Sequence, residues 1–298
     1  MFVGFLVLMM SALTARAQSP EETDPPSLMN TAEAHDMGPG MMGPLVAIDV
    51  SPGNDVTPFA PHWVKGPEGR TLGFGFGIDK MLAPNFDIEI DSAFDSYAPR
   101  EGSRESGFGR VDVLSRMLFI NTPDLQAAIA PQLSFSTGSF AEGFSLSNVG
   151  AALLWGGRGG ALPADWNLGY FRAIELHSDL GYSRIIGDGS GDEIFFDPVI
   201  DYSLPYLQYL NKTQLPWPIR NLCFFTELNF DAVVSGSEQG SPTLYATPGV
   251  SYLTDAYQIT AGVQVPLNRA ASDNQQIALM GEIDFSLDDL PVLGWMPF

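Results

Sequence analysis

The sequence predicts an all-β protein: a transmembrane antiparallel β-barrel of about twelve strands with an irregular N-terminal arm. Three observations predict this fold. Segments of roughly ten residues alternate apolar and polar side chains between about Thr71 and Leu287, and clusters of Gly, Pro, Asn, Asp and Ser separate them. Beyond the run from Phe2 to Leu13, charged residues, Gly or Pro interrupt every apolar stretch, which excludes a bundle of membrane-spanning helices.

The composition fits one folded, exported domain. The chain of 298 residues is 45% hydrophobic and 16% charged, which suffices to close one sizeable barrel and disfavours disorder. Its formal net charge is −21. Nucleic acid is not an expected partner, because phosphate binding requires a basic surface. An acidic balance favours the attraction of cations instead.

Residues 1–17 have the pattern of a secretory signal peptide. The apolar run is followed by Ala15-Arg16-Ala17, so we expect cleavage after Ala17 and export to the outer membrane of a bacterium. The alternative of a short membrane anchor is disfavoured, because the run is shorter than the roughly 20 apolar residues that a spanning helix needs. The single cysteine, Cys223, cannot form an intrachain disulfide.

Residues 18–65 are expected to form a Pro/Gly/Met-rich arm that precedes a barrel at 66–298. Within the arm only Leu45 to Val50 has the composition of a packed element. The arm could extend freely into the periplasm or fold back as a plug in the barrel mouth, and composition leaves both open. One cluster could bind Cu(I) through soft ligands, but its loose spacing favours a solvated arm, so no cofactor is predicted: His35, Met37, Met41 and Met42.

The clearest strand signal is the segment from Phe86 to Asp91. Its apolar residues occupy alternate positions and its three acids occupy the others, so the two kinds lie on opposite faces of a strand. Residues 174–180, 224–231 and 277–287 show the same separation. With their turns, such segments place strands near 71–80, 84–96, 107–120, 124–138, 145–156, 170–187, 193–203, 205–211, 221–235, 242–253, 256–267 and 275–287.

A secreted β-sandwich also alternates and is the main alternative fold. A closed barrel is the one strand architecture that crosses lipid, with apolar side chains outward and a polar lumen. The export signal and the aromatic content favour the barrel, because Tyr and Trp collect at membrane interfaces. Several of them lie near predicted strand ends: Tyr97, Trp155, Trp166, Tyr170, Tyr202, Tyr209, Trp217 and Tyr252.

The C-terminal third carries two further motifs. The penultimate predicted strand ends in Pro266-Leu267-Asn268, and Phe298 ends the chain after a tail that begins at Asp288. In these motifs residues 220–298 resemble the outer-membrane barrel family labelled for the MetA-pathway of phenol degradation. The resemblance implies a transporter-like channel for hydrophobic compounds that is inserted by the outer-membrane assembly machinery. It implies no catalytic residue.

The acidic strand faces are the main candidate site. If the apolar faces meet lipid, one set of polar residues faces the lumen: Asp87, Glu89, Asp91, Asp112, Glu175, His177, Asp179, Glu227, Asp231, Glu282 and Asp284. Such carboxylates would favour cations over anions in a permeation path. Arg110 and Arg116 share the face of Asp112, so the same acids could instead form salt bridges that rigidify a filled barrel.

Glu175, His177 and Asp179 occupy alternate positions on one strand, which suggests acid–base or metal chemistry. Same-face neighbours on a strand lie roughly 6.6 to 7 Å apart, too far to share a metal without a second strand. A hydrogen-bonded lumen histidine is therefore the preferred interpretation. No Gly-x-Ser-x-Gly motif is present to supply a nucleophile, and Gly73 to Gly77 lacks the lysine of a phosphate loop, so its Phe74 and Phe76 are expected to face lipid.

The residues together predict a non-enzymatic channel or transporter for small hydrophobic (aromatic) or cationic solutes. Its expected partners are outer-membrane lipid, the assembly machinery and the solute. Two alternatives are a structural or adhesive surface barrel without an open pore and an outer-membrane hydrolase that uses His177.

Overall fold

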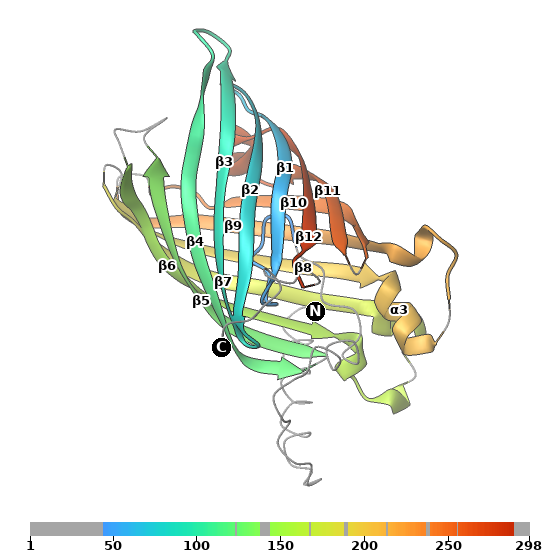
Figure 1. Ribbon diagram of the computed structural model, residues 1–298. Helices are drawn as coiled ribbons and strands as arrows, with labels where there is room; N and C mark the ends of the chain where they lie inside the picture. Colours follow the sequence, from blue (N-terminus) through green and yellow to red (C-terminus); the bar gives the residue numbers. More distant parts are fainter. Residues whose placement is uncertain are drawn as a thin grey trace.

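The computed structural model describes residues 44–288 except 123, 138–143, 167, 188–189, 213, 237–238 and 255. Within this part of the chain, twelve strands form one closed antiparallel barrel in which consecutive strands pair and β1 closes the ring against β12 (Figure 1). The predicted barrel of about twelve strands is confirmed. The proposed signal peptide, the His/Met cluster of the arm and the end of the C-terminal tail lie outside the described residues.

The strands follow one another around the barrel in chain order: β1 (Asp55–Lys65), β2 (Gly69–Ala83), β3 (Phe86–Pro99), β4 (Glu105–Thr122), β5 (Leu125–Thr137), β6 (Phe144–Arg158), β7 (Ile174–Ile185), β8 (Gly191–Ser203), β9 (Leu222–Gly236), β10 (Thr243–Leu253), β11 (Tyr257–Pro266) and β12 (Ile277–Ser286).

Short helices occupy the longer connections. Between β6 and β7 lie η2 (Gly159–Ala161), η3 (Ala164–Trp166) and η4 (Gly169–Ala173), and between β8 and β9 lie α3 (Leu204–Asn211) and η5 (Ile219–Asn221). The connection between β11 and β12 contains α4 (Arg269–Asn274). None of the helices in the described residues is both long and apolar enough to cross a bilayer.

The segment predicted as a strand at 205–211 is instead the helix α3. Ser203 caps it, since its hydroxyl accepts a hydrogen bond from the Tyr206 amide at 3.2 Å, and Pro205 lies in the first turn, where a missing amide costs nothing. Tyr206 and Leu207 are buried while their neighbours are more exposed, a helical pattern that a short apolar run does not distinguish from a strand.

The first strand lies where the arm was expected, so the barrel begins at Asp55 and not at residue 66. β1 contains Pro58 and Pro61, which are uncommon in strands because proline donates no ladder hydrogen bond. The pairing of β1 with β12 shifts in register between Val56 and Phe59, and this bulge accommodates the first proline. The predicted set of strands omits β1 and includes the segment that forms α3. These two errors cancel, so the predicted total of twelve strands is correct.

The two faces of the barrel differ as the alternation predicts. Large apolar side chains are exposed on the outside of every part of the sheet, among them Leu72, Phe74, Phe76, Ile90, Phe108, Phe119, Ile129, Leu153, Phe224 and Leu279. Aromatic rings contact one another across β1 to β4 on this face, and the Phe94 and Phe108 rings pack edge to face with their centroids 5.4 Å apart. The inner face carries the buried carboxylates, Arg116 and small residues.

Candidate functional site

The segment Pro44–Asn54, here called the plug segment, lies inside the barrel (Figure 1). Its backbone and side chains contact strands on different sides of the ring: β9 through Glu227, β7 through Asp179, β5 through Gln126 and β3 through Asp87. A segment that reaches all of these strands at once must cross the lumen. Of the two arrangements left open for the arm, this part of it adopts the plug.

Two apolar patches on the inner wall receive the plug segment. Val50 is 1% exposed and packs against one patch, with Ile48 beside it; the wall residues are Leu114, Leu118, Ala128, Ala130, Ala152 and Leu154. Ala47 packs against the second patch, which consists of Val199, Cys223 and Phe225. Burial of these side chains stabilises the plugged barrel by roughly 25 cal/mol for each Å² of apolar surface removed from water.

Wall carboxylates bind the plug segment through its backbone amides. Both oxygens of Glu227 are used: Oε1 accepts from the Leu45 amide at 2.6 Å, and Oε2 accepts from Val46 at 3.0 Å and Ala47 at 3.1 Å. Asp179 Oδ2 accepts from the Ile48 amide at 2.7 Å. Hydrogen bonds to a charged acceptor are among the stronger ones in proteins, so these carboxylates have a structural task.

Arg116 on β4 is the centre of a buried ion-pair network at the other end of the plug segment. Its guanidinium contacts Asp79 directly, lies 2.8 Å from Asp87 and 3.1 Å from Glu89, and also donates to the Asp49 carbonyl oxygen at 3.4 Å. Asp87 in turn accepts from the Gly53 amide at 2.9 Å. The predicted salt bridges between lumen acids and an arginine are therefore present at Arg116.

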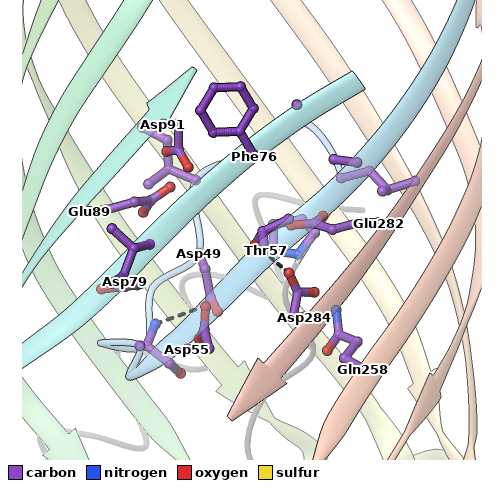
Figure 2. A pocket seen from close by; sticks show the side chains of 18 of the residues that line it. Asp49, Asp55, Thr57, Phe76, Asp79, Glu89, Asp91, Gln258, Glu282 and Asp284 are labelled. Carbon is purple, nitrogen blue, oxygen red and sulfur yellow. Dashed lines mark hydrogen bonds between the residues drawn. The ribbon is translucent and has the colours of Figure 1, made fainter. Parts of the chain in front are cut away.

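Beside the plug segment, between β1, β2, β3 and β12, lies an open cavity of about 680 Å³. Figure 2 shows carboxylates pointing towards it from several elements, and the labelled ones are Asp49, Asp55, Asp79, Glu89, Asp91, Glu282 and Asp284. Asp288 also lines the cavity. Asp284 accepts a hydrogen bond from the Thr57 hydroxyl at 2.5 Å. Burial raises the pKa of the Asp49 carboxyl above its usual range, and the positive charge of Arg116 opposes this rise.

The opposite part of the lumen contains a second, closed polar cluster. Arg158 Nε lies 3.2 Å from Glu175, and His177 Nε2 lies 3.3 Å from Asp201, with all four side chains almost fully buried. Helix α3 covers this cluster, because the Tyr206 hydroxyl donates to Asp124 at 2.5 Å and the Arg158 guanidinium lies 4.7 Å from the Tyr206 ring centroid. This side of the barrel is filled.

The structure separates the three residues that shared a strand face at positions 175, 177 and 179. Glu175 pairs with Arg158 on β6, His177 lies against Asp201 on β8, and Asp179 binds the plug segment. They do not converge on one point. In the described part of the chain, no group of three or more His, Cys, Asp or Glu side chains could hold a metal ion.

The predicted lumen residues thus fall into different environments. Glu89, Asp91, Glu282 and Asp284 line the cavity, whereas Asp87, Glu175, Asp179 and Glu227 are fully buried in contacts with an arginine or the plug segment. Asp112 accepts from Ser134 at 2.5 Å and pairs with Arg110 at 2.9 Å. Asp231 is partly buried on β9.

Sequence reasoning missed Asp49, Asp55 and Asp79 as cavity residues and Arg158 as the partner of Glu175. Asp55 was missed because β1 was assigned to the arm. The alternation of Gly73, Gly75, Gly77 and Asp79 with apolar residues on β2 was a usable signal for Asp79. These glycines leave room inside the wall: a Cβ at Gly77 would overlap the Asp91 carboxylate.

No family model matches the chain, and no curated protein matches it. Among solved structures, a NanC porin aligns with a TM-score of 0.51 at 7% identity, covering 78% of this chain and 98% of the porin. The KdgM porin (TM-score 0.43, 12% identity, 76% and 98% covered) and LpxR from Salmonella typhimurium (TM-score 0.44, 9% identity, 76% and 99% covered) align less well. At such low identity, the likeness to NanC shows that the chain shares the closed barrel fold of a porin.

Proposed function

We propose that the chain is a bacterial outer-membrane channel that passes small cationic solutes along the acidic side of its lumen. The observation that carries the proposal is the open cavity of about 680 Å³ beside the plug segment, lined by eight carboxylates: Asp49, Asp55, Asp79, Glu89, Asp91, Glu282, Asp284 and Asp288. The closed barrel and its apolar exterior support a membrane location, because a closed ring leaves no backbone group unpaired in lipid.

The charges of the cavity favour cations over the hydrophobic solutes that the family resemblance implies. Arg116 is the one arginine or lysine side chain among its lining residues, and it is already engaged by Asp79, Asp87 and Glu89. Asp91 and Asp284 therefore add negative charge that this arginine does not directly neutralise. Carboxylates in a confined, low-dielectric space raise the local concentration of cations and repel anions.

The test is the ion selectivity of the refolded protein in a planar bilayer, taken from the reversal potential under a salt gradient. The wild type should conduct with a preference for cations. The double variant D91N/D284N should lower the cation-to-anion permeability ratio by about two- to fivefold for each charge removed, since unit charges 4 Å apart in water interact by about 1 kcal/mol.

The matched control is Asp273→Asn, which removes one negative charge from an exposed position on α4, away from this cavity. It should leave the permeability ratio unchanged. A folded wild-type barrel that never conducts would contradict the proposal and favour a filled structural barrel. A wild type that conducts with a preference for anions would refute the proposed cation path.

A further inference from the structure

The inner wall of the barrel contains a binding site for a bent stretch of polypeptide backbone. Four consecutive amides of the plug segment, from Leu45 to Ile48, donate to wall carboxylates at 2.6 to 3.1 Å: three to Glu227 on β9 and one to Asp179 on β7. These four hydrogen bonds involve the backbone of the segment and none of its side chains. The two apolar patches beside these carboxylates add shape complementarity, because Ala47 and Val50 pack against them.

The plug segment is held in the lumen without belonging to the barrel sheet. None of its residues pairs with a strand, and the segment is joined to the sheet where β1 begins at Asp55. The acidic cavity lies directly against it, with Leu45, Asp49 and Pro52 among the lining residues. Space for movement is therefore present on one side, and detaching the segment would break no strand pair.

We propose that Glu227 and Asp179 form a backbone-binding site whose occupant is the chain's own plug segment, and that release of this segment widens the lumen. The widening of a conducting path rests on the proposed channel function, whereas the binding and release of the segment do not. Because the segment contacts both the β3–β5 and the β7–β9 sides of the wall, its departure joins the acidic cavity to the space that the segment now fills.

Cys223 provides a reporter of release that does not depend on conduction. It is the one cysteine in the chain, is 1% exposed, and lies in the patch that Ala47 covers. The experiment measures the rate at which a water-soluble maleimide labels Cys223 in the folded protein. Glu227→Gln should raise this rate about tenfold or more, because it removes the charge that accepts three amide hydrogen bonds.

The matched control is Glu282→Gln, which replaces a carboxyl group of the cavity for which the structure shows no hydrogen bond to the plug segment. Its labelling rate should equal that of the wild type. Asp179→Asn serves as a second test if Glu227→Gln does not fold, and it should also raise the rate. Equal labelling of the wild type and of a folded Glu227→Gln or Asp179→Asn variant would overturn the proposed release.

A covalent lock tests the effect on conduction. Ala47→Cys places a second thiol in the same buried cluster as Cys223, and oxidation should join the two and hold the segment in place. Bilayer conductance should be lower for the oxidised than for the reduced variant, and A47C/C223S should show no redox response. Faster labelling without conductance in any variant would refute the channel function alone. Equal conductance of the oxidised and the reduced Ala47→Cys variant would refute the gating.

Discussion

Removing the charge of Arg116 should destabilise the barrel strongly. The Arg116 side chain is 3% exposed and contacts Asp79 and Asp87, whose side chains are 9% and 0% exposed, as well as the more accessible Glu89. Arg116→Gln would leave the two buried carboxylates without their cation. Breaking a buried ion pair in this way costs about 3 to 5 kcal/mol of unfolding free energy, because a charge is left in a poorly solvating place.

The assay is reversible unfolding of the refolded barrel by urea or guanidinium in lipid vesicles, followed by tryptophan fluorescence. The same strand offers the control: Arg110 pairs with Asp112 at 2.9 Å, but its side chain is 61% exposed, so Arg110→Gln should cost less than about 1 kcal/mol. The loss at Arg116 should also be smaller in acid, where protonation neutralises the stranded carboxylates.

Equal effects of the two substitutions would refute this reasoning, since they would show that burial does not govern the strength of these ion pairs. Arg116→Lys should lie between the wild type and Arg116→Gln, because lysine keeps the charge but cannot match the guanidinium contacts to several carboxylates at once. A lysine variant as unstable as the glutamine variant would indicate that geometry, rather than charge, dominates.

Two further predictions concern single contacts, one in the packing of the wall and one in the hydrogen bond that holds α3. Gly249→Ala should lower the unfolding free energy by about 1 to 3 kcal/mol in the same assay, because the added Cβ would overlap the Phe225 ring and lie 2.7 Å from the Ala261 carbonyl oxygen. Gly75→Ala, whose Cβ would lie 3.4 Å from that of Ala60, is the control and should be close to neutral. Tyr206→Phe should lower the unfolding free energy by about 1 to 3 kcal/mol, because it leaves the Asp124 carboxylate without the hydroxyl that donates to it at 2.5 Å. Tyr170→Phe, at a residue 71% exposed, is the control and should leave the unfolding free energy unchanged.

The faces of the strands could be predicted because a strand alternates its side chains locally, whatever it pairs with. Phe86 to Asp91 shows this directly, since Ile90 is exposed outside while Asp87 is buried within and Asp91 lines the cavity. The two errors in strand assignment also have local causes. Prolines in β1 weakened its pattern, and the short apolar run of α3 fits a strand and a helix equally well.

The sequence by itself determined the closed all-β architecture and an acidic inner face. The tertiary structure alone decided what each acid does, because that depends on strand register and on segments far away in the chain. Glu175, His177 and Asp179 are equivalent by pattern, yet they meet Arg158, Asp201 and the Ile48 amide respectively. The plug segment could not be assigned from composition, since its stability comes from distant wall residues such as Glu227 rather than from any local preference of its own.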